Sequence, residues 1–465
     1  MTKKAGTRGI GRLIIIGLSL PLAMLSGAER APRNAPPQDA FLDTLQIRTL
    51  TYFIDTTPLE TGLAPDRYPS KSPCSIAAAG FALTAFPIAV ERGLLTRQQA
   101  AQRVLNALQF FDQLRLHPQA MTTTSHRGFY YHFLKIPSGE REWHCELSNI
   151  DTAILLLGAM VCQGYFDGSS TAEKTIRALS DSLYFRADWN WFMNGRKTMS
   201  MGWQPEEGFN NTTWTGYMEA MMLYILGLGS PTHPLPDAVW PAWCSTYVWA
   251  PYYGQEFISF GPLFGHQFSH VWIDFRGIKD AYMREKGSDY FENSRRATLS
   301  QRAYAIDNPQ QFRDYGENIW GFTACDGPAD VALTIDGRRR LFHTYSARGV
   351  SFDWVNDDGT IAPYAAGASF PFAPEICLPA LKMMRQRYGD SLWTPYGFLD
   401  AFNPTFRTKT TPMGWFDHDY LGIDQGPLLA MIENHRSGLI WNIMRKNPYI
   451  VRGLKRAGFS GGWLN

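Results

Sequence analysis

Glu219 is the only side chain that can be charged near neutral pH in the run WTGYMEAMMLYILGLG, which covers residues 214–229. The run predicts a helix on which apolar residues surround the carboxyl group on almost every side. Burial in such surroundings disfavours the charged form, so we expect a raised pKa for Glu219. A carboxylic acid that stays protonated near neutral pH can serve as a general acid. Glu219 is therefore the candidate proton donor, and the alternative is a buried structural glutamate that hydrogen-bonds to a loop.

Isolated acids recur along the chain. Asp151, Glu375, Asp400 and Asp424 each stand alone among aromatic and aliphatic residues. This pattern indicates carboxylate chemistry on a neutral, polyhydroxylated substrate. Asp400 lies in a predicted loop, and Asp424 lies just before a predicted helix, where the helix dipole favours a carboxylate. Either of these two could be the base that activates water.

Some of these acids also have purely structural interpretations. Asp151 is the third residue after Ser148 and could complete a helix cap. Glu375 follows a proline at a predicted helix start, so it could be either a cap or a sugar ligand. Glu433 and Arg436 are three residues apart on one predicted helix, and we expect them to pair with each other.

Aromatic and polar residues supply candidate sugar contacts. The segment FGHQFSHVWIDFRG could line a sugar site or pack in the interior through His266, His270, Trp272, Asp274 and Arg276. The chain has 15 Trp and 21 Tyr, many of them in predicted loops. Such residues suit stacking on sugar rings, although aromatics are also ordinary core material. The candidate platforms are Trp203, Trp214, Trp320 and Tyr364.

The elements that must position these residues are mostly helical. Hydrophobic periodicity predicts helices over 41–56, 74–93, 97–115, 148–165, 171–186, 214–228, 267–285, 288–306, 373–388, 425–445 and 448–457. The loops between them are long and rich in Gly, Pro, Trp and Tyr. Short hairpins are predicted on two of these loops, over 128–136 and 349–365.

About half of the predicted helices are apolar nearly throughout, and half are amphipathic. This division predicts two shells, an inner ring buried on all sides and an outer ring that is half exposed. We therefore expect an all-α fold, an α/α toroid whose long loops form a cleft at one end. An ordinary helical bundle would not need loops of this length.

The first residues predict a leader. A basic start precedes the apolar run 13–25 and the small residues Ser26, Gly27 and Ala28, as in a cleavable signal peptide over 1–28. A Pro-rich spacer (29–40) and a single domain (41–465) would follow. We therefore expect export, to a periplasm or to the medium, and an uncleaved anchor is the alternative.

Charge and cysteine spacing exclude several classes of protein. The chain has 44 basic and 42 acidic residues, and four of the basic ones lie in the leader, so the mature protein is nearly neutral. This balance gives no support for nucleic acid or an anionic membrane surface as a partner. The six cysteines and ten histidines show no metal-binding spacing, and the cysteines are interpreted as buried thiols. We expect no metal, and a monomer or weak dimer.

Several stretches together resemble the glycoamylase-like domain, the group that includes glycoside hydrolase family 144, the bacterial β-1,2-glucanases. The resemblance spans roughly residues 45–460. It rests on IDTA (150–153), YMEAMMLYILGLGSPTHP (217–234), FGHQFSHVWIDFRGIKD (264–280), NIWGFTACDGP (318–328), FPFAPEICLPAL (370–381), YGFLDAFNP (396–404) and YLGIDQGPLLAMIENHRSGLIW (420–441).

The resemblance implies an (α/α)6 barrel and an inverting enzyme that cleaves β-1,2-glucan to sophorose or short oligosaccharides without metal or organic cofactor. The family's proton donor falls on Glu219. Its base falls on Asp400 or Asp424, with Asp400 favoured, and Asp151 would orient substrate or water. Asp326 and Glu433 lie in matching motifs and join the candidate substrate contacts. Transfer to a sugar, another β-linkage and a non-catalytic periplasmic glycan-binding protein remain alternatives.

Overall fold

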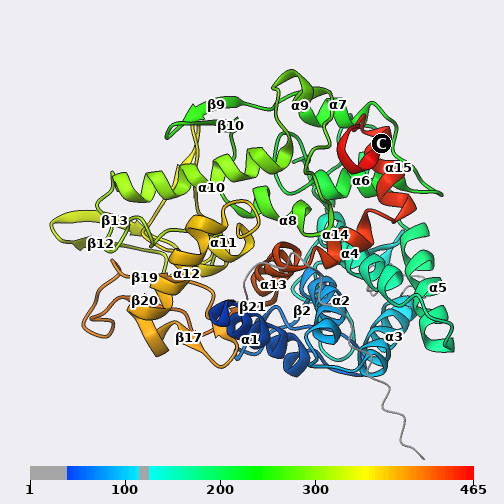
Figure 1. Cartoon of the computed structure of the whole chain (residues 1–465), viewed down its shortest axis with the longest axis horizontal. Coiled ribbons are helices and arrows are strands. Elements are labelled where there is room, and N and C mark those ends of the chain that lie inside the picture. Colours follow the sequence, from blue (N-terminus) through cyan, green and yellow to red (C-terminus); the bar gives the residue numbers. More distant parts are fainter. Residues whose placement is uncertain (1–38, 115–124) are drawn as a thin grey trace, which may run out of the picture. The chain divides into compact units, whose positions relative to one another are not determined.

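The computed structural model describes residues 39–114 and 125–465 (Figure 1). Residues Gln38–Asn465 form one compact unit. The predicted signal peptide and most of the predicted spacer lie outside the described residues. Within the described ranges, no helix combines the length and apolar character needed to cross a bilayer.

Helices dominate the described residues. The α-helices are α1 (Ala40–Thr56), α2 (Ile76–Glu91), α3 (Arg97–Gln113), α4 (Asn149–Tyr165), α5 (Thr171–Phe185), α6 (Met221–Gly229), α7 (Val239–Cys244), α8 (Phe264–Trp272), α9 (Ala281–Glu285), α10 (Tyr290–Asp307), α11 (Pro363–Ala368), α12 (Pro374–Tyr388), α13 (Gly422–Arg436), α14 (Leu439–Met444) and α15 (Pro448–Arg456). The fold is therefore mostly helical, as predicted.

The strands are short and pair mostly as two-stranded antiparallel ladders. They are β1 (Arg67–Tyr68), β2 (Cys74–Ser75), β3 (Ser125–His126), β4 (Phe129–Tyr131), β5 (Phe133–Leu134), β6 (Leu147–Ser148), β7 (Gly202–Gln204), β8 (Gly208–Phe209), β9 (Trp249–Tyr252), β10 (Gln255–Ile258), β11 (Ala324–Cys325), β12 (Val331–Ile335), β13 (Arg338–Phe342), β14 (Ser346–Ala347), β15 (Gly349–Val350), β16 (Val355–Asn356), β17 (Trp393–Thr394), β18 (Gly397–Phe398), β19 (Phe402–Asn403), β20 (Trp415–Phe416) and β21 (Tyr420–Leu421). One larger sheet has the order β3-β4-β6-β7-β8.

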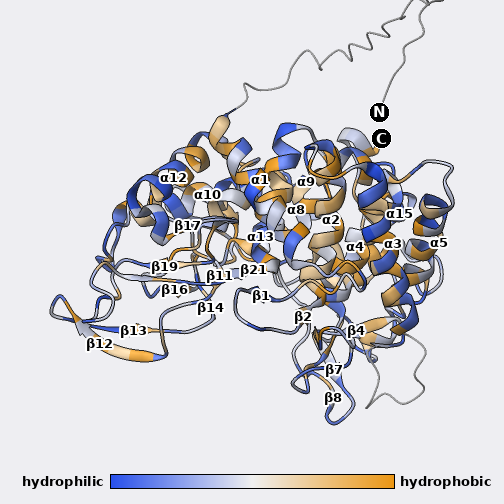
Figure 2. Cartoon of the chain, turned by 90° about the horizontal axis from the view of Figure 1, so that it is seen from below, coloured by the Kyte–Doolittle hydropathy of each residue, from blue (hydrophilic) through white to orange (hydrophobic). Residues whose placement is uncertain are grey.

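Strands and loops gather on the side of the unit opposite the helix layer (Figure 2). Strands β2, β4, β7 and β8 lie on that side, and so do β12 and β13. The strands connect and extend the long loops that the sequence predicts, so the loop side is the place where a cleft can form.

Most predicted helices begin and end within two residues of the observed bounds. Three predictions were wrong in extent. The segment 267–285 is two helices, α8 and α9, because the chain leaves α8 at Trp272 and is extended at Ile273. The segment 425–445 is α13 and α14, which are separated at Gly438 with φ 68°. Helix α6 begins at Met221, seven residues later than predicted.

The hairpin prediction over 128–136 was wrong, and the one over 349–365 was confirmed in its first half only. In 128–136, β4 pairs with β3 and β6, whereas β5 pairs with β2. In 349–365, β15 and β16 form the hairpin, but the segment ends inside the buried helix α11, which Pro363 opens. In 128–136 the local pattern therefore identified strands without identifying their partners.

The helices fall into a buried set and an amphipathic set. Nearly all residues are buried in α2, α4, α6, α8, α11 and α13. Helices α3, α5, α10 and α12 bury one face each. Helix α2 packs against α4 and α13, and α13 packs against α11 and α8. The two predicted kinds of helix are therefore both present.

Two glycines bring α2 and α4 into backbone contact. A Cβ atom at Gly80 would lie 2.5 Å from the carbonyl oxygen of Ile154, and one at Gly158 would lie 2.2 Å from the carbonyl oxygen of Gly80. Any larger residue at either position must push the helices apart. This contact fixes the start of α4, which carries Asp151, relative to α2.

Candidate active site

Two adjoining cavities open on the loop side of the molecule. The Glu219 cavity has a volume of about 320 Å³ and is lined by Glu219, Asp151, Asp424, Arg67 and Tyr364 among others. The second cavity, called the Trp203 cavity, has a volume of about 570 Å³ and is lined by Trp203 and Trp214 among others. His132, Ile150 and Asp151 line both cavities, so the two spaces meet at these residues.

Glu219 lies in the turn that precedes α6, not on the helix as predicted. Ser269 of α8 fixes this turn, because its Oγ donates to the Glu219 carbonyl oxygen (2.7 Å) and accepts from the Met222 amide (3.0 Å). Burial, with an added contribution from the charge of Asp151, raises the pKa of Glu219 to about 7. The predicted raised pKa is confirmed, and Glu219 can hold a proton near neutral pH while it faces the cavity.

Asp424 faces Glu219's cavity from the first turn of α13, and Asp400 lies buried behind it. Burial and mutual repulsion raise the pKa of Asp400 well above its usual range, and burial raises that of Asp424. The two carboxyl groups hydrogen-bond when one of them holds a proton. One oxygen of each, Oδ1 of Asp400 and Oδ2 of Asp424, is buried and receives no N–H or O–H donor. Burial therefore favours protonation of this pair near neutral pH.

More carboxylates surround this pair. The Asp400 carboxylate accepts the Asp326 amide (2.8 Å), and Asp326 itself pairs with Arg67 (2.6 Å). Arg67 also contacts Asp66, at 3.4 Å. Burial, together with Asp400 and Asp326, raises the pKa of Asp417 to about 8.

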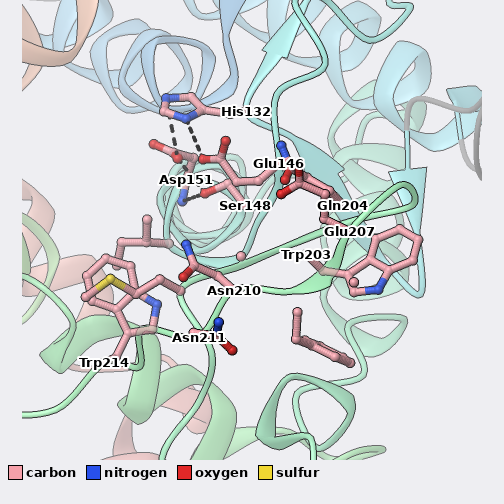
Figure 3. A pocket seen from close by; sticks show the side chains of 15 residues that line it. His132, Glu146, Ser148, Asp151, Trp203, Gln204, Glu207, Asn210, Asn211 and Trp214 are labelled. Carbon is pink, nitrogen blue, oxygen red and sulfur yellow. Dashed lines mark hydrogen bonds and ion pairs between the residues drawn. The ribbon is translucent and has the colours of Figure 1, made fainter.

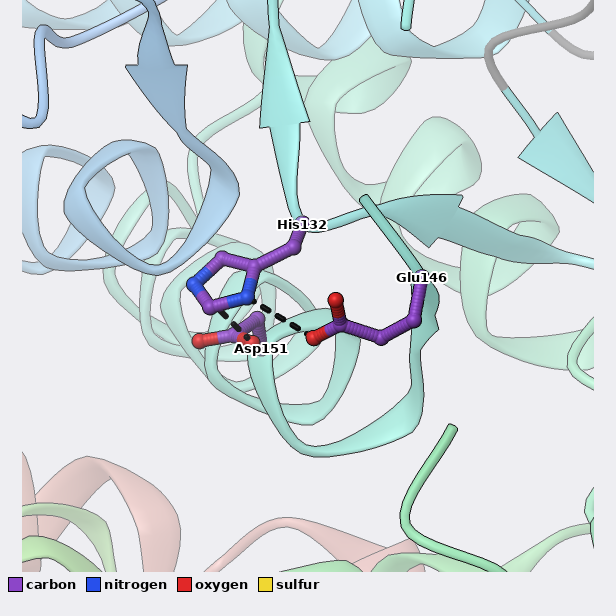
Figure 4. A group of neighbouring side chains, drawn as sticks. All are labelled: His132, Glu146 and Asp151. Carbon is purple, nitrogen blue, oxygen red and sulfur yellow. Dashed lines mark hydrogen bonds and ion pairs between the residues drawn. The ribbon is translucent and has the colours of Figure 1, made fainter. Parts of the chain in front are cut away.

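His132 stands between two carboxylates at the junction of the cavities (Figure 4). Its Nδ1 lies 2.9 Å from Glu146 and its Nε2 lies 3.6 Å from Asp151. Burial opposes the charged imidazolium, but Asp151 and Glu146 outweigh it and raise the pKa of His132 to about 9. Asp151 also accepts the Ser148 hydroxyl at 2.5 Å, and the Asp151 amide donates to the same hydroxyl, so Ser148 caps α4 as predicted.

The Trp203 cavity is lined by aromatic and amide side chains (Figure 3). Trp203 and Trp214 lie on its wall with Asn210 and Asn211. The Trp214 indole donates to Oδ1 of Asn149 (2.9 Å), which fixes the ring. Indole rings and amides are suited to the faces and hydroxyls of sugar rings.

Folding brings together part of the predicted site. Glu219, Asp151 and Asp424 line one cavity with the predicted platform Tyr364, and Trp214 lines the adjoining one with Trp203. Asp400 and Asp326 lie directly behind Asp424.

The other predicted sugar contacts lie elsewhere. His266, His270, Trp272 and Trp320 are fully buried and line neither cavity. Burial lowers the pKa of His266 to about 4 and that of His270 to about 3, so both are neutral core residues. An apolar helix with two histidines is more simply read as core packing, and here that interpretation holds.

Four charged candidates are engaged in ion pairs instead. Asp274 binds Arg276 (2.8 Å) and Arg445, and Glu375 binds Arg295 (2.6 Å). Glu433 accepts from Arg92 and Gln46. The predicted Glu433–Arg436 pair was wrong, because Arg436 binds Asp43 and Gln46 instead.

Sequence reasoning missed His132, Arg67, Glu146 and Asp417. Each is brought to the site by strand or loop contacts between segments far apart in the chain. The acidic spacing in FDHDY (416–420) was the one local signal for Asp417.

Two groups at the site offer ligand atoms close enough for a metal ion. The atoms of His132, Glu146 and Asp151 lie within 4.8 Å of one another, as do those of Asp326, Asp400 and Asp417. In the first group, the imidazolium of His132 offsets one of the two carboxylate charges. All six cysteines lie in the described residues and are free thiols, five of them buried, as predicted for Cys145, Cys162 and Cys377.

Comparison with known proteins places the chain in a family. The sequence model of the Glycoamylase family, described as "Putative glucoamylase", matches residues 211–448. A structure from Bacteroides uniformis, described as a "putative glucoamylase", is 34% identical, with a TM-score of 0.80, covering 93% of this chain and 100% of that one. The chain belongs to the Glycoamylase family.

Two relatives are named by their activities. The endo-β-1,2-glucanase of Chitinophaga pinensis, solved with sophorotriose and glucose, is 27% identical over 91% of this chain and 99% of its own, with a TM-score of 0.79. An exo-β-1,2-glucooligosaccharide sophorohydrolase of Parabacteroides distasonis is 26% identical over 90% of this chain. This chain spans 58% of the length of that curated relative. Distant homologues are thus glycoside hydrolases that act on β-1,2-glucan.

Proposed function

We propose that this protein is an inverting glycoside hydrolase that cleaves β-1,2-glucan to sophorose or short β-1,2-glucooligosaccharides. One observation carries the proposal: Glu219, with its pKa raised to about 7, faces the same cavity as the carboxyl group of Asp424. A protonated acid and a second carboxyl group around one sugar-sized space are the groups that glycoside hydrolysis requires. The activities of the two relatives above supply the linkage.

In this mechanism Glu219 protonates the leaving glycosidic oxygen. Asp424, rather than the Asp400 favoured from sequence, activates water on the opposite face of the sugar, because Asp424 lines the cavity and Asp400 lies behind it. Asp400 accepts the shared proton and leaves Asp424 ionised. Asp151 orients the substrate or water between the two cavities. In this proposal the carboxyl groups of acid and base stand roughly 6.5–9.5 Å apart, the spacing that leaves room for water.

Two further features belong to the proposal. The six buried helices form the inner ring of an (α/α)6 toroid and the amphipathic helices its outer ring. The protein is exported by its signal peptide and works in the periplasm or outside the cell, without an organic cofactor or metal, as a monomer or weak dimer.

Product analysis tests the function. Purified protein is incubated with linear β-1,2-, β-1,3- and β-1,4-glucans, and the first products are followed by NMR. We expect release from the β-1,2-glucan alone, with sophorose or short oligosaccharides appearing first as the α-anomer. A β-anomer would indicate retention, products longer than the substrate would indicate transfer, and binding without cleavage would favour a glycan-binding protein.

A further inference from the structure

Trp143 is unusual among the tryptophans of this protein because its ring stands in solvent. Its exposed fraction is 63%, and Trp354 at 41% is the other exposed tryptophan in the described residues, which hold all 15. An exposed indole presents a flat apolar face that can stack on a sugar ring.

The backbone beneath Trp143 is held in an uncommon conformation. Trp143 has φ 55° and His144 has φ 53°, so two successive residues with a Cβ atom occupy the left-handed region. This region crowds the Cβ against the backbone, and it persists only where the surroundings enforce it. A turn of this kind turns the indole outward.

Arg141 enforces the turn. Its guanidinium donates to the carbonyl oxygens of Cys145 (2.7 Å) and His144 (2.7 Å) and pairs with Glu206 (2.6 Å). It also lies 4.5 Å from the ring centre of Tyr131. The Arg141 side chain is itself buried. The turn is therefore rigid, and Trp143 is presented without the entropy cost of ordering a loose loop.

Ring contacts connect Trp143 to both cavities. Its indole packs edge-on against Phe133 (5.2 Å between centroids), which stacks on His132 at 4.0 Å. Phe133 lines the Glu219 cavity, and His132 lines both. Gln204, which lines the Trp203 cavity and is labelled in Figure 3, donates to the His144 carbonyl oxygen (2.9 Å). Trp143 itself lines neither cavity, but its ring contacts Phe133, which lines the Glu219 cavity and stacks on the residue that lines both.

We propose that Trp143 is a distal stacking platform for a glucosyl unit of a glucan chain that extends out of the two cavities. The inference rests on the proposed function for the identity of the glucan. The apolar face of a pyranose ring covers an indole, and the ring's hydroxyls meet the polar groups alongside it, Glu142 and the exposed His144. The platform makes long chains better substrates than short ones.

The test compares long and short substrates in three variants. In Trp143→Ala we expect KM for long linear β-1,2-glucan to rise roughly three- to tenfold, since a stacked aromatic contributes about that factor. The value of kcat at saturation stays within twofold, and kcat/KM for sophorotetraose is unchanged. The matched control is Trp354→Ala, an exposed tryptophan that packs on Gly261 and not on Phe133, and it should leave both substrates unaffected.

Trp143→Gly separates binding from folding. Glycine adopts the left-handed conformation without strain, so this variant should melt no lower than the wild type while its KM for long glucan rises as in the alanine variant. An unchanged KM for long glucan, an equal loss on sophorotetraose, or a lower melting temperature in the glycine variant would each overturn the platform.

Binding distinguishes this inference from the proposed function. Affinity electrophoresis of Glu219→Gln protein, with and without Trp143→Ala, is run in gels that contain β-1,2-, β-1,3- or β-1,4-glucan. If the wild type cleaves no β-1,2-glucan but Trp143 still strengthens retention by another glucan, the proposed linkage fails and the platform stands. If cleavage occurs and Trp143 changes retention by none of the glucans, only the platform fails.

Discussion

The Nε2 atom of His132 lies 3.6 Å from Oδ2 of Asp151, which places a cation directly beside the carboxylate that acts on Glu219. Glu146 holds the other side of the ring. The acid therefore shares its cavity with a charged network and not with a single neighbouring group. The network ties the two cavities together electrostatically, because His132 and Asp151 line both.

The pH dependence of catalysis should report this network. The kcat/KM of the wild type is expected to fall on the alkaline side with a pKa near that of Glu219, about 7. In Asp151→Asn a negative charge is lost, so the pKa of Glu219 falls and the alkaline limb moves to lower pH, by roughly 0.5 unit. Initial rates measured across pH give the position of the alkaline limb in the wild type and in Asp151→Asn. Glu207→Gln, in the Trp203 cavity, should leave the limb in place, and an upward move in Asp151→Asn would refute the assignment.

Replacing the proton donor should remove chemistry and leave binding intact. Glu219→Gln keeps the size of the side chain but cannot give up a proton to the leaving oxygen. We expect kcat on β-1,2-glucan to fall by about 1,000-fold or more, since general acid catalysis contributes about 100- to 10,000-fold. Reducing-end release and calorimetric binding are measured together. Retention of wild-type rate and products would show that another group is the acid.

The two aspartates of the proton-sharing pair should differ in their effects. Asp424→Asn removes the group that faces the cavity, and we expect a loss in kcat of about 1,000-fold or more. Asp400→Asn can still accept the Asp326 amide and can donate to Asp424, as a protonated Asp400 would. Its loss should be at least about tenfold smaller. Steady-state rates of both variants decide the base, and the reverse order would assign the role to Asp400.

Ionisation of the buried Asp417 carboxyl group should lower the free energy of unfolding as pH rises. Its folded pKa is raised from 3.8 to about 8, so the folded protein holds a proton that the unfolded chain has lost. The stability that depends on this group is complete below pH 3.8 and is lost as pH rises through 8. Asp417→Asn should therefore melt about 2 °C or more above the wild type at pH 8.5, with little difference at pH 4.

Scanning calorimetry at the two pH values measures this difference. Asp390→Asn, at an exposed position, should change neither melting temperature. A lower melting temperature for Asp417→Asn at pH 8.5 would mean that the buried carboxylate stabilises the fold.

Sequence predicted the parts of the site that depend on local patterns. Glu219, Asp151 and Asp424 were recognisable because an acid in an apolar run must be either capped, paired or used, and all three line the Glu219 cavity. Most helices were predicted within two residues, because their periodic faces and caps are local. The start of α6 was not, because the turn at Glu219 depends on Ser269 of another helix.

The rest depends on contacts between distant segments. His132 and Glu146 meet because β4 pairs with β6 in the larger sheet, a register that no local pattern reveals. Conversely, His266, His270 and Glu433 looked available in sequence but are enclosed by the core or bound by side chains from other helices. Polar residue type alone could not separate these cases.

The missing side chains at Gly80 and Gly158 have a consequence for substrate choice. Because α2 and α4 touch through their backbones, the wall of the cavity that carries Asp151 has little freedom to move. Adaptation to glucans of different length or curvature must then come from the neighbouring loops, which carry the β7–β8 hairpin and the 141–145 turn. Relatives with the same chemistry can therefore diverge in chain-length preference by exchanging loops while these two helices stay locked.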